Sequence, residues 1–175
     1  MAWDKFIGQN RAVSVLKSYI GLNRAQGSFI FSGPKGGGKF SIAKEFAKSC
    51  NCLNSRGDSC GTCSNCLQIE REVHPGICII RPEDKSGEIT IDQIRNLQKF
   101  LNLSAQNCEK KFFIVKDADT MNTEAANSFL KSLEEPPMDS VIILITSRSG
   151  NLIPTIRSRC QEIKFKNDVG DIFEN

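Results

Sequence analysis

The sequence predicts an α/β fold, built on a parallel sheet with helices on its flanks. An apolar run at residues 29–31 leads into a glycine-rich loop and then into a stretch of helix formers. A second run, residues 111–115, ends in acidic residues, and a third, residues 141–145, is apolar almost without interruption. Continuous apolar strands that alternate with helices are typical of a parallel sheet that is buried on both faces.

The other elements follow from the spacing of apolar residues and from helix caps and breakers. Thr90 can cap a helix, and the pair Pro136 and Pro137 must end one. We expect helices over residues 10–20, 38–50, 64–72, 90–101 and 122–135, and further strands over residues 77–80 and 161–165. His74 is the only histidine, so no histidine-based catalytic pair is available, and a role in a turn is expected for it.

The glycine-rich loop fits the P-loop pattern, in which four residues separate Gly33 from the pair Gly38 and Lys39. Glycines such as Gly33, Gly36 and Gly38 let backbone N–H groups turn towards a phosphate, and the lysine reaches the outer phosphates. A glycine-rich turn without a ligand is the alternative. The strand before the loop and the helix after it favour a nucleotide-binding loop.

Two positions that would carry the magnesium chemistry of a P-loop protein hold unsuitable residues. Phe40 stands where a serine or threonine hydroxyl should bind Mg²⁺. Lys116 follows the second apolar run, where an aspartate should orient the metal, and a cation repels Mg²⁺. The sequence therefore predicts a P-loop fold without a Mg²⁺ site, in which ATP binding is doubtful.

A cysteine-rich stretch interrupts the α/β pattern. Cys60, Cys63 and Cys66 are separated by two residues each, and Cys52 precedes them. Four thiolates at such spacings are typical of a closed, structural zinc site, which leaves no open coordination position for catalysis. Cys50 is the alternative to Cys52 as the fourth ligand, and a set of buried or reactive cysteines is the alternative to a metal site.

Composition suits a single globular domain. The chain has 175 residues, of which 39% are hydrophobic and 25% charged, and eight are cysteines. The net charge of +3 is too small to indicate nucleic-acid binding. No membrane span or signal peptide is visible, so we expect a cytoplasmic protein whose cysteines are reduced. We expect one domain over residues 1–166, with the cysteine module at about 50–67. Residues 167–175 are expected to form the start of a linker to a lid domain.

Three motifs together resemble one family. The stretch Leu133-Glu134-Glu135-Pro136-Pro137, the triplet Ser158-Arg159-Cys160 and the cysteine module are similar to those of bacterial clamp-loader subunits of DNA polymerase III, which are AAA+ proteins. The resemblance implies an AAA+ P-loop domain with a zinc-binding insertion. Residues 7–9, residues 91–95 and the loss of both metal positions are more like the non-hydrolysing delta prime type.

The resemblance also assigns roles to individual residues. It makes residues 33–39 the Walker A loop, Lys116 and Asp117 the Walker B positions, and Thr146 the sensor 1 residue. Arg159 matches the arginine finger that reaches the ATP of a neighbouring subunit. The zinc ligands of the family correspond to Cys52, Cys60, Cys63 and Cys66.

The function implied is that of a stator, which lends Arg159 to a motor neighbour while a sliding clamp is loaded in DNA replication. Its partners would be gamma/tau-like and delta-like subunits and, through the complex, the sliding clamp and primer-template DNA, with no membrane. An ATP-hydrolysing gamma/tau-like motor subunit is the alternative. A small-molecule P-loop kinase is a more distant one, because it leaves the two peptide motifs unexplained.

Overall fold

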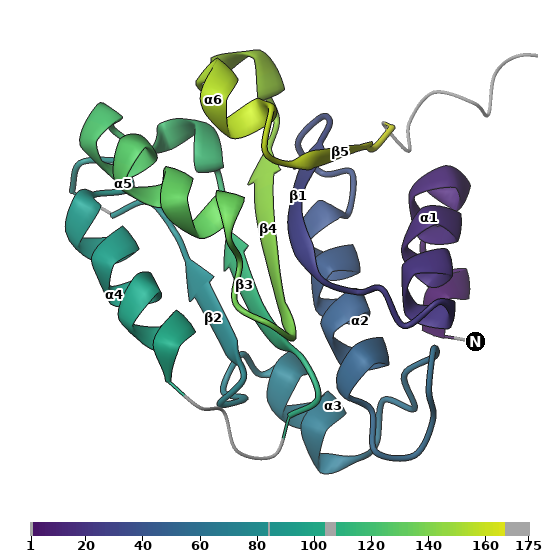
Figure 1. Ribbon diagram of the computed structural model, residues 1–175. Helices are drawn as coiled ribbons and strands as arrows, with labels where there is room; N and C mark the ends of the chain where they lie inside the picture. Colours follow the sequence, from purple (N-terminus) through teal and green to yellow (C-terminus); the bar gives the residue numbers. More distant parts are fainter. Residues whose placement is uncertain (1, 84, 104–107, 167–175) are drawn as a thin grey trace, which may run out of the picture.

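The computed structural model describes residues 2–83, 85–103 and 108–166. Its strands form one sheet in the order β2-β3-β4-β1-β5, and every pairing is parallel (Figure 1). The strands are β1 (Gly27–Ser32), β2 (Ile77–Ile80), β3 (Lys111–Val115), β4 (Ser140–Thr146) and β5 (Gln161–Lys164). The predicted α/β fold with a parallel sheet is confirmed.

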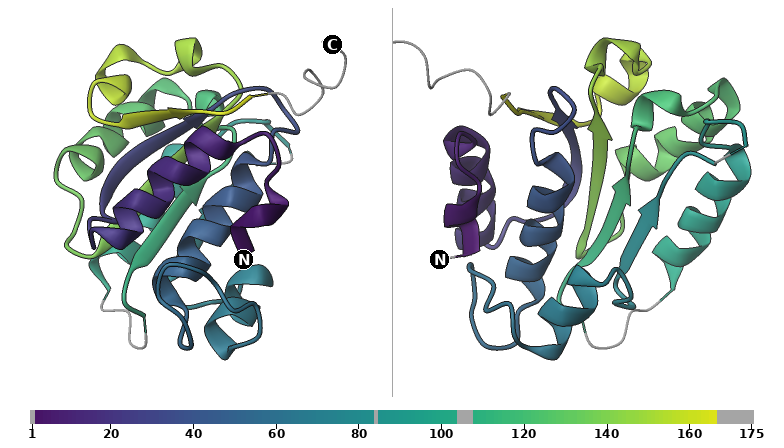
Figure 2. Two further views of the ribbon diagram at one scale, coloured as in Figure 1. Left: turned by 90° about the vertical axis from the view of Figure 1, so that its right-hand side faces the viewer. Right: turned by 180° about the vertical axis from the view of Figure 1, so that it is seen from behind.

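Helices cover both faces of this sheet. They are α1 (Asn10–Gly21), α2 (Lys39–Asn51), α3 (Ser64–Glu70), α4 (Ile91–Asn102), α5 (Thr123–Glu134) and α6 (Pro154–Arg157). Short 3-10 turns are η1 (Ala2–Lys5), η2 (Ala118–Thr120) and η3 (Ser149–Asn151). Figure 2 shows α1, α2 and α3 on one side of the sheet and α4 and α5 on the other.

The hydrophobic core consists of two clusters, one on each face of the sheet, because successive side chains of a strand point to opposite faces. In β3, Phe112 packs in the cluster that holds α1 and α2, whereas Phe113 packs in the cluster that holds α4 and α5. The ring of Phe46 on α2 meets the ring of Phe112 edge to face, with centroids 5.3 Å apart. Burial on both faces explains why the strands read as continuous apolar runs.

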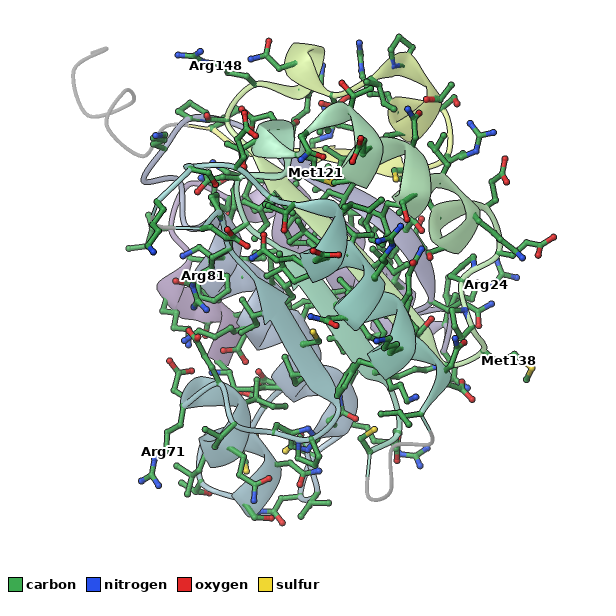
Figure 3. All side chains as sticks on the ribbon, turned by 90° about the vertical axis from the view of Figure 1, so that its left-hand side faces the viewer. Arg24, Arg71, Arg81, Met121, Met138 and Arg148 are labelled. Carbon is green, nitrogen blue, oxygen red and sulfur yellow. The ribbon has the colours of Figure 1, made fainter. Side chains whose placement is uncertain are left out.

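The carboxyl ends of all five strands lie at one edge of the sheet, because the strands are parallel. Figure 3 marks this edge with Met121 and Arg148, which follow β3 and β4, while Met138, which precedes β4, lies lower in the view. The glycine-rich loop follows β1 at the same edge. Ligands of open α/β sheets bind at this edge.

Helix ends follow local chemistry. Thr90 and Gln93 form a capping box at the start of α4, in which the Thr90 N–H donates to Oε1 of Gln93 at 3.0 Å. Helix α3 ends at Glu70, two residues earlier than predicted, and Glu72 just beyond it has a left-handed φ of 61°. In the described part of the chain, no helix has the length and apolar character needed to cross a membrane.

Candidate functional site

The glycine-rich loop joins β1 to α2, as the sequence predicts. Gly33, Gly36 and Gly38 have φ of 148°, 85° and 70°, and Gly38 is the N-cap residue of α2. The N–H of Gly33 donates to the carbonyl of Thr146 at 3.3 Å, which brings the loop against the end of β4. A Cβ atom at Gly33 would lie 2.4 Å from the carbonyl oxygen of Phe165, just after β5. This close approach of the chain also requires glycine at position 33.

Lys39, the lysine of the loop, turns inward. Its ammonium donates hydrogen bonds to the carbonyl oxygens of Gly33 and Pro34, and the residue is only 7% exposed. Burial lowers the pKa of Lys39, and the nearby carboxylate of Asp117 opposes part of that shift. The side chain that would contact a phosphate is therefore bound to its own loop.

Phe40 occupies the predicted metal position and is surrounded by cations. The ammonium nitrogens of Lys116 and Lys44 lie 4.4 Å and 5.4 Å from the centroid of its ring, and the guanidinium carbon of Arg81 lies 5.6 Å from it. A cation over an aromatic face is attracted by the ring. Three positive groups around one ring oppose a bound divalent cation at this place.

Thr146 lies at the carboxyl end of β4 and is fully buried. Its hydroxyl donates to Oδ1 of Asp119 at 2.6 Å and accepts a hydrogen bond from the N–H of Arg148 at 2.9 Å. Both of its hydrogen-bonding roles are thus used within the chain. Asp119 was not among the predicted site residues, although the spacing Asp117-Ala118-Asp119 after a strand was the available signal.

Gln9, which was not among the predicted site residues either, contacts the chain on the outer side of the loop. Gln9 is 3% exposed, and its Nε2 donates to the carbonyl of Lys166 at 2.8 Å while its Oε1 accepts from the N–H of Lys166 at 3.1 Å. A Cβ atom on Gly37 would lie 3.0 Å from the same carbonyl oxygen. The chain after β5 therefore lies directly against the P-loop.

The cysteine module brings four sulfur atoms together. The Sγ atoms of Cys52, Cys60, Cys63 and Cys66 all lie within 4.8 Å of one another. Ligand sulfurs around a tetrahedral zinc ion are about 3.8 Å apart, given Zn–S bonds of about 2.3 Å, so a small adjustment would close the site. The four residues that the spacing predicted can therefore hold a metal ion.

Hydrogen bonds to sulfur favour the thiolate form of Cys60, whereas burial raises the pKa of Cys66. The N–H groups of Cys60 and Cys63 donate to the sulfurs of Cys52 and Cys60, each at 3.3 Å. Hydrogen bonds from Thr62 lower the pKa of Cys60 to about 5. Cys50 lies on α2 outside the cluster, and burial raises its pKa to about 12. Cys52, rather than Cys50, is the fourth member.

Arg159 follows α6, and its side chain forms hydrogen bonds with residues of α5 and α6. Its Nε donates to Oε1 of Glu134 at 2.6 Å, its Nη2 donates to the same oxygen, and its Nη1 donates to the carbonyl of Thr155 at 2.8 Å. The side chain of Arg159 remains 29% exposed. Burial raises the pKa of the neighbouring Cys160 to about 12, so this residue of the triplet is a packed thiol.

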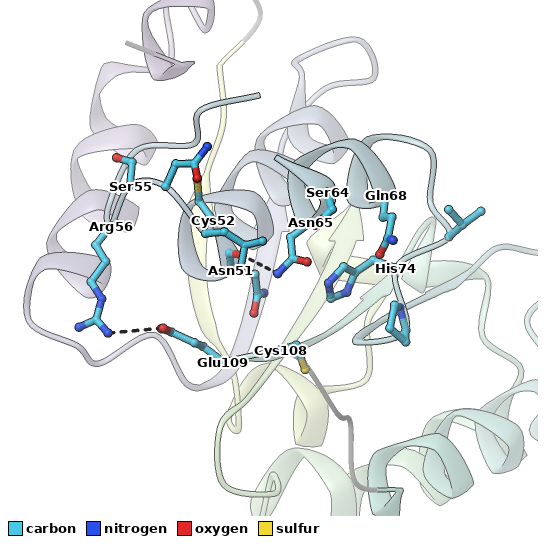
Figure 4. A pocket seen from close by; sticks show the side chains of 14 residues that line it. Asn51, Cys52, Ser55, Arg56, Ser64, Asn65, Gln68, His74, Cys108 and Glu109 are labelled. Carbon is cyan, nitrogen blue, oxygen red and sulfur yellow. Dashed lines mark hydrogen bonds and ion pairs between the residues drawn. The ribbon is translucent and has the colours of Figure 1, made fainter. Parts of the chain in front are cut away.

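A cavity of about 1030 Å³ lies beside the cysteine module, at the amino ends of β2 and β3 and thus opposite the P-loop (Figure 4). Arg56 and Glu109 form an ion pair at its rim, and both are well exposed. His74 in its wall is buried, and its Nδ1 accepts the N–H of Gly76 at 3.0 Å. The predicted turn role of His74 is confirmed.

The sheet order, the P-loop between β1 and α2 and the polar residues at the ends of β3 and β4 define a P-loop domain of the AAA+ class. Two solved structures from Thermotoga maritima share this fold. A DNA polymerase III gamma subunit-related protein has a TM-score of 0.61 at 31% identity, covering 87% of this chain and 45% of that one. The RuvB Holliday junction branch migration motor has a TM-score of 0.59 at 16% identity, covering 95% and 47%.

A family model described as DNA polymerase III, delta subunit, matches residues 8–169, and the chain belongs to this family. The delta prime subunit of Bacillus subtilis is 38% identical over 90% of this chain and 47% of its own length. The delta prime subunit of Pseudomonas aeruginosa is 37% identical over 76% and 41%. The tau subunit of Bacillus subtilis is more distant, at 30% identity over 94% and 29%. The chain thus spans less than half the length of these relatives and is delta prime-like.

Proposed function

We propose that this chain is the P-loop domain of a clamp-loader subunit that hydrolyses no ATP itself and supplies Arg159 to the ATP site of a neighbouring subunit. One contrast carries the proposal. The metal-bearing positions hold Phe40 and Lys116, and Lys39 is bound to its own loop, whereas Arg159 is present and partly exposed. The chain therefore has the arginine that would act on the nucleotide of a partner, and it lacks the metal-binding groups that would act on a nucleotide of its own.

A guanidinium suits this role because it is always charged and presents N–H groups in a plane that matches phosphate oxygens. Placed at the γ-phosphate of a neighbour, it stabilises the charge that develops in phosphoryl transfer. The neighbour would supply the Mg²⁺ ligands and the attacking water. One subunit can therefore complete a catalytic site without a working site of its own.

The setting of this role follows from the relatives. The motor neighbours would be gamma/tau-like subunits, a delta-like subunit would complete the loader, and the complex would act on the sliding clamp and primer-template DNA in the cytoplasm. Residues 1–166 would form one AAA+ domain. Residues 167–175, which lie outside the described residues, would begin the linker to a lid domain.

Zinc is the metal we propose for the cysteine cluster, since four thiolates in a tetrahedral arrangement favour Zn²⁺. Its role would be structural. The module is joined to the domain core through Ser59, whose hydroxyl donates to Oε1 of the buried Glu45 on α2. A metal that holds the module together would therefore also hold a contact to the P-loop helix.

A motor subunit is the second candidate, favoured by the intact Gly33-to-Lys39 pattern and by the similarity to tau. It requires Mg²⁺-dependent ATP binding in spite of Phe40 and Lys116. The two candidates differ in which residue matters for ATP turnover. The stator depends on Arg159, and the motor depends also on its own Lys39.

The proposal is tested with the full-length protein in a reconstituted loader. Arg159→Ala should lower ATP turnover by the complex while the subunits still assemble, because the neighbouring site loses its trans-acting cation. Arg157→Ala is the matched control, since Arg157 is an exposed arginine two residues away. Equal turnover by the Arg159→Ala and Arg157→Ala complexes would refute the proposed role.

A further inference from the structure

Glu134 and Arg159 form a side-chain pair that joins two elements far apart in sequence. Glu134 is the last residue of α5, and Arg159 follows α6. Oε1 of Glu134 accepts hydrogen bonds from both Nε and Nη2 of Arg159. These two nitrogens form one side edge of the guanidinium, so a single carboxylate oxygen takes that whole edge.

The pairing leaves N–H groups on both Nη atoms of the guanidinium available. A guanidinium carries five N–H donors in one plane. Glu134 takes two of them, and the Thr155 carbonyl takes one on Nη1. One N–H on Nη1 and one on Nη2 therefore have no partner among the described residues. A pair of N–H groups on these two nitrogens is the arrangement that binds two oxygens of a phosphate.

Without a cationic partner, the carboxylate of Glu134 would destabilise helix α5. A carboxylate at the C-terminus of a helix faces the negative end of the helix dipole. Helix α5 ends at this residue, and Pro136 and Pro137 prevent its continuation. The guanidinium of Arg159 offsets the unfavourable charge. The two residues therefore hold each other in place at the surface, where Arg159 is 29% and Glu134 46% exposed.

We propose that Glu134 is a positioning residue for Arg159, which holds the guanidinium with its Nη edge directed outward towards a phosphate on the neighbouring subunit. This inference rests on the proposed function. An arginine side chain has many rotamers, and fixing one of them costs conformational entropy. If Arg159 is ordered before the complex forms, this entropy is not lost in the catalytic step. Because one N–H on each Nη atom has no partner among the described residues, the contact with Glu134 need not break for Arg159 to act.

The test uses the reconstituted loader with full-length protein and compares Glu134→Ala, Glu134→Gln, Glu135→Ala and Arg159→Ala. Glu135 is the matched control, since it is an exposed neighbour with no ion pair among the described residues. Glu134→Ala should lower the kcat of ATP turnover about tenfold with little change in KM, because orientation rather than substrate binding is lost. Glu134→Gln should retain an intermediate kcat, since its amide oxygen still accepts from Nε and Nη2.

The outcomes separate this inference from the proposed function. A loss of turnover with Arg159→Ala but not with Glu134→Ala would overturn the positioning role and leave the trans role standing. A rise in turnover with Glu134→Ala would show that Glu134 restrains Arg159, which also overturns the inference. No effect of Arg159→Ala would overturn both. Thermal unfolding and assembly of each variant exclude misfolding, and Glu134→Gln keeps the side-chain shape if Glu134→Ala is unstable.

Discussion

The ammonium nitrogen of Lys116 lies 4.4 Å from the centroid of the Phe40 ring. The family resemblance places these two residues at the positions that would jointly hold Mg²⁺, the hydroxyl of the P-loop helix and the Walker B aspartate. In this chain the replacements contact each other. Under the proposed function, this cation–aromatic pair, worth about 1 kcal/mol in such settings, stands where two metal ligands would converge.

The close approach of β5 to the P-loop predicts opposite effects for two glycine substitutions. Gly33→Ala should destabilise the fold by about 2 kcal/mol or more, because its φ is 148° and its Cβ would lie 2.4 Å from the Phe165 carbonyl oxygen. Gly21→Ala at the end of α1 should stabilise it by about 0.5 kcal/mol, since nothing lies within 4 Å. Urea unfolding of both variants checks the two signs, and a neutral Gly33→Ala would contradict the contact.

Glu45 is a buried charge on which several elements depend. Its carboxylate is 0% exposed and accepts from Lys5 at 2.9 Å, from Lys48 at 3.0 Å and from Ser59. Glu45→Ala should cost about 3 kcal/mol, because it leaves buried donors without an acceptor. Lys5→Ala removes only a half-exposed partner and should cost under about 1 kcal/mol. The fluorescence of buried Trp3 reports unfolding, and similar costs for the two variants would contradict the assigned burial.

The Lys48 ion pair predicts a pH dependence through Glu70. The hydrogen bond from Lys48 lowers the pKa of Glu70 from 4.5 to about 2. A carboxylate with a lowered folded-state pKa contributes stability that is present above its unfolded pKa and is lost as the pH falls through the folded pKa. Because the Glu70 side chain is 56% exposed, solvent screening keeps the effect small.

The test compares the natural chain with Glu70→Gln. The natural chain should have the higher unfolding midpoint above about pH 5, and the difference should disappear towards about pH 2. Glu88→Gln, on an exposed residue, should show no such window. A difference that grows on acidification would contradict the role of the Lys48 pair.

The cysteine cluster predicts which sulfurs are needed for metal. The reduced natural protein should contain one zinc ion per chain, and Cys52→Ser should abolish it, because a structural site needs all of its thiolates. Cys50→Ser is the matched control and should keep the zinc, since Cys50 lies on α2 outside the cluster. Removal of the metal by a chelator should lower the thermal unfolding midpoint. Zinc retained by Cys52→Ser but lost from Cys50→Ser would reverse the ligand assignment.

Local patterns predicted most of the fold and the members of the cysteine cluster. The P-loop was predictable because strand, glycines and lysine are adjacent in sequence, and the cysteine cluster because its ligands are closely spaced. The order of the strands in the sheet was not predictable, because a continuous apolar run does not indicate which strands pair with it. The parallel pairing of β4 with β1 depends on contacts between residues more than 100 positions apart.

The contacts that define the state of the site were not predictable for the same reason. Gln9 and Lys166 are 157 residues apart, and Arg159 and Glu134 are 25 apart. The inward turn of Lys39 depends on two backbone carbonyls, which every sequence has. Residue types indicated which metal-binding groups are missing from the expected positions, whereas the structure shows which partners the side chains of the site bind.

The proposed loss of metal chemistry at the P-loop is tested most directly by titrating ATP against the chain with and without Mg²⁺ in a calorimeter. The Phe40→Thr, Lys116→Asp double variant is the comparison, because it restores a hydroxyl and a carboxylate at the two metal positions. Mg²⁺ should leave the affinity of the natural chain unchanged and should tighten ATP binding to the double variant. Tighter binding of ATP to the natural chain when Mg²⁺ is added would contradict this account and favour a motor subunit.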